Sequence, residues 1–163
     1  MTRVNPPEIA DERAMLTNWL AFHRATVRVK CEGLTDEQMR LRSVPPATLS
    51  PLGMVRHLAE VEAFWWREVV EGSSYSLYSS ETNRDGDFDF APDASVVEAW
   101  AEWEAQVAHA DEVFAKHQLD DVVKERGVDN SIRWIMVHLI EEYARHNGHL
   151  DLLRQCIDGV TGE

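Results

Sequence analysis

The sequence predicts an all-α protein that folds as a four-helix bundle. It contains four long segments with apolar residues three or four positions apart, separated by glycine, proline and serine residues of the kind that begin and end helices. Alternation of apolar and polar residues, which would indicate strands, is almost absent. The chain has 163 residues and 44% of them are hydrophobic, which suffices for one core. We therefore expect a single domain over residues 1–163.

The first helix is expected over residues 7–32. Prolines at its start favour a helix N-terminus, and Gly33 favours its end. Its predicted buried stripe includes Ile9 and Trp19. A short capped turn is expected over residues 35–38.

The second helix is expected to begin at Ser50 and Pro51, which are typical of the N-cap and the first helical position, and to end before Gly72. Residues 73–92 are acidic and aperiodic. A loop of this length inside a compact domain is typical of a functional segment. We interpret it as a loop that covers the functional site.

The third helix is expected over residues 94–117, with Asp93 as its cap and Val97 among its buried residues. A polar connection follows. The fourth helix is expected to begin near Ser131 and to end at Gly159.

Charge and composition exclude several classes of function. Sixteen Lys and Arg against 29 Asp and Glu give a net charge of −13, which argues against binding nucleic acid or anionic membranes. No apolar run approaches the length of a membrane span or a signal peptide, so we expect a cytoplasmic protein. The two cysteines, Cys31 and Cys156, form no CxxC pair and are predicted to be core-facing thiols.

Two polar residues interrupt the apolar stripe of the fourth helix. The stripe passes through Ile135 and Leu139 and then reaches Glu142 and His146, which are four residues apart and therefore share one helix face. His57 lies on or beside the stripe of the second helix and is a third candidate ligand. Burying a carboxylate costs several kcal/mol unless a cation offsets it. Two His and one Glu are typical of catalytic zinc sites and also suit non-haem iron.

The residues alone leave a structural alternative open. Glu142 and His146 could form an ion pair on a solvated edge, and His57 could be a hydrogen-bonded core histidine. The sequence has no GxSxG elbow, Walker loop or Rossmann fingerprint. Chemistry at this site would therefore depend on a metal and a cosubstrate.

Two segments resemble the DinB-like superfamily. They are residues 52–58, Leu-Gly-Met-Val-Arg-His-Leu, and residues 138–149, which end in Glu-Tyr-Ala-Arg-His-Asn-Gly-His. The second resembles the actinobacterial branch with the motif Glu-Tyr-Ala-Arg-His-x-Gly-His. Members are four-helix bundles with a metal held by three side chains. Better-understood relatives are thiol S-transferases that use mycothiol, bacillithiol or glutathione, among them mycothiol-dependent maleylpyruvate isomerases.

The resemblance extends over residues 10–158 and implies a ligand set of His57, Glu142 and His146. His149 stands where many members carry glutamine, and is either an additional ligand or a departure from the family pattern. His138 either orients the Glu142 carboxylate or is packed without a role. Arg145 either binds a substrate carboxylate or is solvated.

The implied activity is transfer of a low-molecular-weight thiol, mycothiol in first place, to an electrophilic small molecule. The implied metal is zinc, with nickel or iron as alternatives, and the implied assembly is a homodimer. Two other functions stay open: hydrolysis or oxidation at the same metal, and a non-catalytic, metal-stabilised binding or stress protein.

Overall fold

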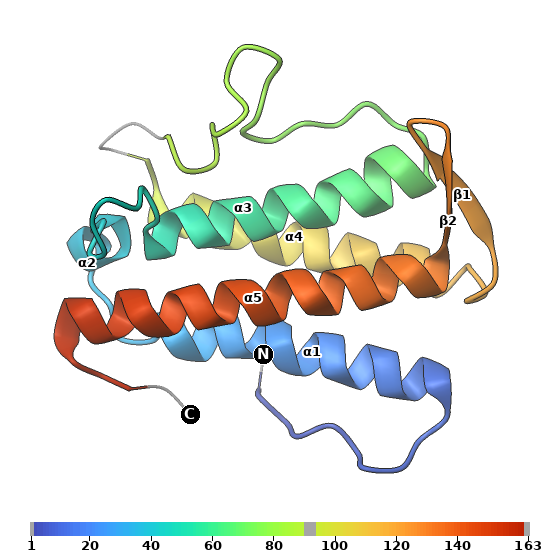
Figure 1. Ribbon diagram of the computed structural model, residues 1–163, viewed down its shortest axis with the longest axis horizontal. Coiled ribbons are helices and arrows are strands. Elements are labelled where there is room, and N and C mark those ends of the chain that lie inside the picture. The colour runs from blue at the N-terminus through green and yellow to red at the C-terminus, as the bar shows by residue number, and fades with distance from the viewer. Residues whose placement is uncertain (1, 90–93, 162–163) are drawn as a thin grey trace. The chain divides into compact units, whose positions relative to one another are not determined.

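The computed structural model describes residues 2–89 and 94–161, which are mostly helical (Figure 1). None of the helices in these two ranges is both long enough and apolar enough to cross a membrane. The elements in chain order are α1 (Glu12–Cys31), α2 (Asp36–Arg40), α3 (Pro51–Ala63), the π-helical η1 (Phe64–Val70), α4 (Val96–Phe114), β1 (Val122–Glu125), β2 (Val128–Ser131) and α5 (Ile132–Asp158).

Helix α1 begins later than predicted. Its N-cap is Asp11, whose side chain accepts a hydrogen bond from the Ala14 amide at 2.8 Å, and the preceding prolines are not helical. Ile9 therefore lies outside the helix and is 94% exposed. Trp19 is 41% exposed, so the predicted buried stripe was wrong at both positions.

The second predicted helix is confirmed as α3 followed directly by η1. Ser50 Oγ accepts a hydrogen bond from the Gly53 amide at 3.1 Å, as expected of an N-cap. In the last turn the Glu71 amide donates to the Trp66 carbonyl five residues earlier, which is π-helical pairing. Gly72 then adopts φ +71°, a conformation that favours glycine.

Helix α4 is shorter than its predicted range and is capped by Ser95, whose Oγ accepts from the Glu98 amide at 3.1 Å. The predicted cap, Asp93, lies outside the described residues. Val97 is exposed, so its predicted burial was wrong. The start of α5 is as predicted, because Ser131 Oγ accepts from the Trp134 amide at 3.1 Å.

The polar connection expected before the last helix contains a feature that the sequence did not predict, since residues 122–131 form an antiparallel hairpin of β1 and β2. Glu125 pairs with Val128, so Arg126 and Gly127 alone form the turn. Both have positive φ, +46° and +85°, as a tight hairpin turn requires. Both valines that begin the strands, Val122 and Val128, are exposed, so no buried apolar face marks the hairpin in the sequence.

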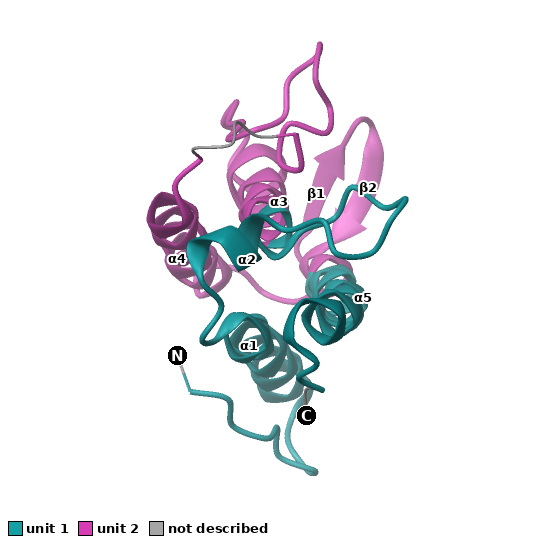
Figure 2. Ribbon diagram, turned by 90° about the vertical axis from the view of Figure 1, so that its left-hand side faces the viewer, with its two compact units in different colours: residues 1–54, 136–163 teal, residues 55–135 magenta. Residues whose placement is uncertain are grey.

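The chain divides into two compact units, coloured separately in Figure 2. In the unit of residues 1–54 and 136–163, α1 packs against α5 through an ion pair between Lys30 and Asp151 and through Arg154, whose Nη1 donates to the Glu32 carbonyl at 2.7 Å. In the unit of residues 55–135, η1 contacts α4, where Arg67 Nε donates to Gln106 Oε1 at 2.7 Å. A four-helix bundle over a single domain stays a prediction.

The two cysteines lie in different environments. Cys31 is buried at the end of α1, as predicted, and burial raises the pKa of its thiol to about 12. Cys156 is exposed, so the prediction of a core-facing thiol was wrong there. Residue 156 lies in the last turns of α5, where most neighbouring positions are solvent-accessible.

Candidate metal centre

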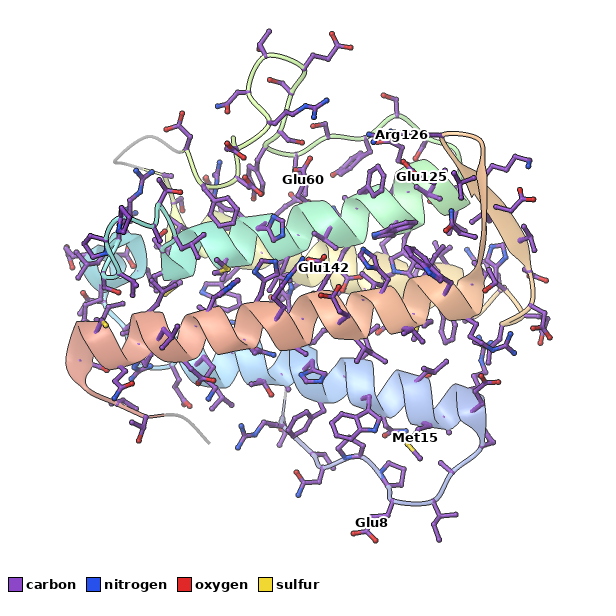
Figure 3. All side chains as sticks on the ribbon, in the orientation of Figure 1. Glu8, Met15, Glu60, Glu125, Arg126 and Glu142 are labelled. Carbon is purple, nitrogen blue, oxygen red and sulfur yellow. The ribbon has the colours of Figure 1, made fainter. Side chains whose placement is uncertain are left out.

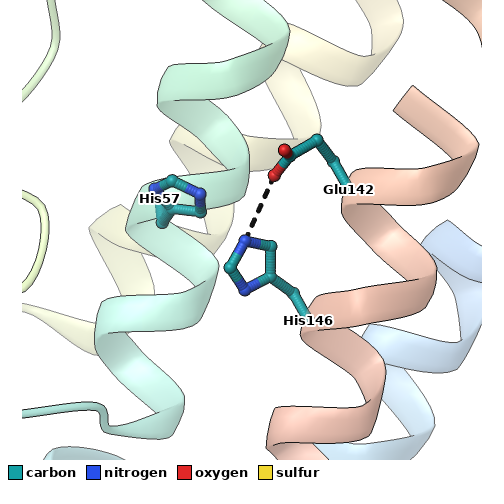
Figure 4. A group of neighbouring side chains, drawn as sticks. All are labelled: His57, Glu142 and His146. Atoms are coloured by element: carbon teal, nitrogen blue, oxygen red, sulfur yellow. Dashed lines mark ion pairs between the residues drawn. The ribbon is translucent and has the colours of Figure 1, made fainter. Parts of the chain in front are cut away.

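Glu142 and His146 face each other one turn apart on α5. The distance from Glu142 Oε2 to His146 Nε2 is 3.2 Å (Figure 4). Only 8% of Glu142 and 7% of His146 is exposed. The two side chains lie within ion-pair distance, as the structural alternative holds, but they are buried and do not lie on a solvated edge.

The spacing of these two atoms fits a shared metal ion. Tetrahedral zinc holds nitrogen and oxygen ligands at about 2.0–2.2 Å, which places neighbouring donor atoms about 3.3 Å apart. The observed 3.2 Å matches this separation. A carboxylate oxygen and an imidazole nitrogen are also the donor types that zinc and non-haem iron accept.

Glu142 lies near the middle of α5 (Figure 3). Two neighbouring side chains contact its second carboxylate oxygen, Oε1. Arg145 Nη2 donates a hydrogen bond to Oε1, and His138 Nε2 lies 3.9 Å from the same atom. The hydrogen bond to Glu142 is also the main reason why the pKa of Arg145 is raised. These contacts orient the carboxylate so that Oε2 faces His146.

His149 contacts the second nitrogen of the His146 ring. The two Nδ1 atoms are 3.2 Å apart, so one ring donates and the other accepts. His149 therefore lies where it can fix the orientation of the His146 ring.

A second group on α5 also has metal-like spacing. His138, Glu141 and Glu142 each offer a ligand atom, and these atoms lie within 4.8 Å of one another. Glu141 is exposed, and its carboxylate lies 3.6 Å from Arg145 Nη1. Exposed carboxylates are commonly found without a metal ion, whereas a buried carboxylate needs a cation or another partner, so the buried pair is the better candidate.

His57 projects from α3, in the unit of residues 55–135, and is held by the loop that follows η1. Its Nδ1 lies 2.7 Å from Asp87 Oδ2, and its ring stacks on Phe88 with centroids 5.2 Å apart. Sequence reasoning missed Asp87, because a contact between residues 30 positions apart follows no helical spacing. The local signal was Asp85-Gly86-Asp87, an acidic turn in an otherwise aperiodic loop.

The remaining histidines have local roles. His109 Nε2 pairs with Glu71 at 2.7 Å, and His117 Nδ1 pairs with Asp121 at 3.1 Å. His23 is half-buried, and burial lowers its pKa. None of the three belongs to a metal-type group within the part of the chain that the structure describes.

A mostly helical chain with a buried Glu-x-x-x-His pair on its last helix has the features of the DinB-like class. The family model described as Mycothiol-S-transferase matches residues 15–159, and the chain therefore belongs to this DinB-like family. A search among curated proteins gave no match. Family membership confirms the superfamily expected from residues 52–58 and 138–149, and it supports a thiol S-transferase at the general level.

Proposed function

We propose that this protein is a metal-dependent enzyme that activates a low-molecular-weight thiol, mycothiol in first place, for transfer to an electrophilic small molecule. The proposed metal ligands are His57 Nε2, Glu142 Oε2 and His146 Nε2. The observation that carries the proposal is the buried Glu142–His146 pair, with its donor atoms 3.2 Å apart. Membership in the mycothiol S-transferase family supports the choice of thiol.

The charges of the proposed ligands suit an anionic sulfur. Two neutral imidazoles and one carboxylate contribute a charge of −1 to the site. When bound there, a divalent ion supplies a net positive charge that stabilises a thiolate near neutral pH. No nucleophile from the protein is then required, in agreement with the absence of recognisable nucleophile motifs in the sequence.

Three other residues of α5 orient these ligands. Arg145 and His138 hold Glu142 Oε1 and leave Oε2 directed at His146. His149 occupies Nδ1 of His146, which leaves Nε2 as the ligand atom. We assign Arg145 to the carboxylate first, and binding of a substrate carboxylate by the same guanidinium stays a prediction.

Elemental analysis of the purified protein tests the metal site. We expect about one zinc or nickel ion per chain in the wild type, and loss of the metal in His57→Ala, Glu142→Ala and His146→Ala. The matched control is His117→Ala, which removes a histidine that also pairs with a carboxylate four residues away but lies outside the proposed site. Wild-type metal content in all three ligand variants contradicts the proposal.

A thiol-transfer assay tests the activity. The loaded wild type should accelerate consumption of mycothiol by an electrophile such as a chlorodinitrobenzene, and the three ligand variants should not. Iron content with oxygen-dependent turnover would favour oxidation, and ester cleavage without thiol would favour hydrolysis. A fully loaded protein that performs none of these reactions would favour a non-catalytic role.

Cobalt substitution distinguishes the two roles open to His149. Visible absorption of bound Co²⁺ reports the number of ligands. If His149 acts through the Nδ1 atom of His146, His149→Ala should weaken cobalt binding about 10–100-fold and leave the spectrum unchanged. A changed spectrum at full loading would instead identify His149 as a ligand.

A further inference from the structure

The loop that follows η1 is attached to α3 by side chains on one stretch of that helix. Glu60, labelled in Figure 3, accepts hydrogen bonds from the amides of Leu77 and Tyr78 at 3.0 and 2.8 Å. One turn earlier, Arg56 donates to the carbonyls of Gly86 and Asp87 at 2.8 and 2.9 Å. The loop is therefore attached to α3 at residues 77–78 and again at residues 86–87, through side chains that flank His57 in the sequence.

Two segments of this loop also pass close to each other, with Gly86 beside the backbone of Tyr78. A Cβ atom there would lie 2.0 Å from the carbonyl oxygen of Tyr78, so only glycine permits this approach. The guanidinium of Arg56 lies over the Tyr78 ring, 3.8 Å from its centroid. These contacts deliver the next residue, Asp87, to the side of α3 that carries His57.

Asp87 is built to accept hydrogen bonds. It is 5% exposed, its Oδ1 accepts from the Phe88 amide at 2.9 Å, and its Oδ2 lies 2.7 Å from His57 Nδ1. An ionised carboxylate cannot donate, so His57 Nδ1 must carry the proton of this hydrogen bond. In the neutral ring, the lone pair is then on Nε2.

We propose that Asp87 is a positioning residue that holds His57 in its Nδ1–H form and thereby makes Nε2 its metal-binding atom. The inference rests on the proposed function, in which His57 is a ligand. A carboxylate that accepts the second N–H of a ligating histidine fixes the ring and makes the nitrogen ligand more basic, which changes metal affinity by about 10–100-fold. The acidic loop would thus influence metal affinity through a single side chain, that of Asp87.

Zinc titration of the metal-free protein tests this role. Asp87→Ala should raise the Kd for zinc about 10–100-fold, and Asp87→Asn, which keeps an acceptor oxygen, should restore part of the affinity. Glu60→Ala is the matched control, since it detaches the loop at Leu77 and Tyr78 without removing the acceptor of His57. Its Kd should stay within about threefold of the wild type.

A second readout needs no metal. Long-range ¹H–¹⁵N NMR spectra of the metal-free protein, recorded where histidines are neutral, identify which ring nitrogen of each histidine is protonated. The signals of His57 are assigned by their loss in His57→Gln. They should report Nδ1–H in the wild type and in Glu60→Ala, and a shift toward Nε2–H in Asp87→Ala.

The outcomes separate this inference from the function on which it rests. Wild-type zinc affinity in His57→Ala would refute the proposed metal site itself. Weakened binding in His57→Ala, with unchanged affinity and an unchanged tautomer in Asp87→Ala, would refute only the role of Asp87. Equal losses in Glu60→Ala and Asp87→Ala would assign the effect to attachment of the loop and also overturn the inference.

Discussion

Zinc should raise the thermal stability of the wild type far more than that of Glu142→Gln. A ligand that binds only the folded state at 100 times its Kd adds about 2.7 kcal/mol to the free energy of unfolding. At roughly 2.1 cal/mol/K per residue, the entropy of unfolding of this 163-residue chain is about 0.34 kcal/mol/K. The melting temperature of the wild type should therefore rise by about 8 °C.

The variant replaces the Oε2 donor by a neutral amide of nearly the same shape. If the affinity falls about 100-fold, the same zinc concentration equals the new Kd, and the gain in stability drops to about 0.4 kcal/mol. The melting temperature should then rise by only about 1 °C. Each protein is compared with itself, with and without zinc, so loss of the hydrogen bond from Arg145 and the ion pair with His146 does not enter the difference.

Differential scanning fluorimetry or calorimetry measures both shifts. The matched control is His117→Gln, which removes an i,i+4 ion pair with Asp121 and should keep the full increase of about 8 °C. An equal zinc shift in the wild type and in Glu142→Gln would refute the assignment of Glu142 as a ligand. The absence of a shift in the wild type would refute a zinc site altogether.

Three further predictions concern the scaffold. A thiol reagent should modify Cys156 but not Cys31 in the folded protein, because burial raises the pKa of the Cys31 thiol to about 12; counting modified thiols in the wild type and in Cys156→Ser checks this. Burial lowers the pKa of His23 from 6.5, so His23 becomes protonated in the unfolded chain at a higher pH than in the folded protein. The free energy of unfolding should therefore decrease as the pH falls from 6.5 toward the lower pKa of the folded state. Urea unfolding at several pH values checks this, and the free energy of unfolding of His23→Gln should depend less on pH. Gly86→Ala should destabilise the protein by about 1–3 kcal/mol and expose its loop to proteolysis, whereas Gly148→Ala, with open space at its Cβ, should be neutral or stabilising by up to about 1 kcal/mol.

The starts of α3 and α5 and the pair on α5 could be predicted because they depend on local rules. Ser50 and Ser131 cap helices through hydrogen bonds to amides three residues later, and the spacing that stacks Glu142 on His146 is a property of any α-helix. Each of these features is decided within about one turn of the chain. The sequence alone therefore identified them.

The hairpin of β1 and β2 could not be predicted by the same rules. Its strands have no alternating apolar face, and its turn places Arg126 at φ +46°, where asparagine or aspartate would be the recognisable signal. The hairpin depends on backbone pairing between Val122 and Ser131 and between the residues that follow, not on side-chain pattern. The start of α1 was also predicted wrongly. Two prolines favoured an early start, but the helix begins after Asp11, whose side chain caps it.

The hydrogen-bond partners of His57 and His146 differ in their distance along the chain, and therefore in whether the sequence alone could identify them. His57 and His146 each have Nδ1 occupied within their own unit, by Asp87 at 2.7 Å and by His149 at 3.2 Å. The resemblance to the DinB-like superfamily named His149, which lies three residues from its partner on α5, whereas Asp87 comes from a loop whose path there depends on Arg56 and Gly86. The two partners also differ chemically, because a carboxylate only accepts, while an imidazole accepts or donates. Asp87 therefore fixes the tautomer of His57 before any metal binds, whereas His146 and His149 can exchange roles as donor and acceptor, so we expect the two histidines to differ in how strongly each is pre-organised for a metal.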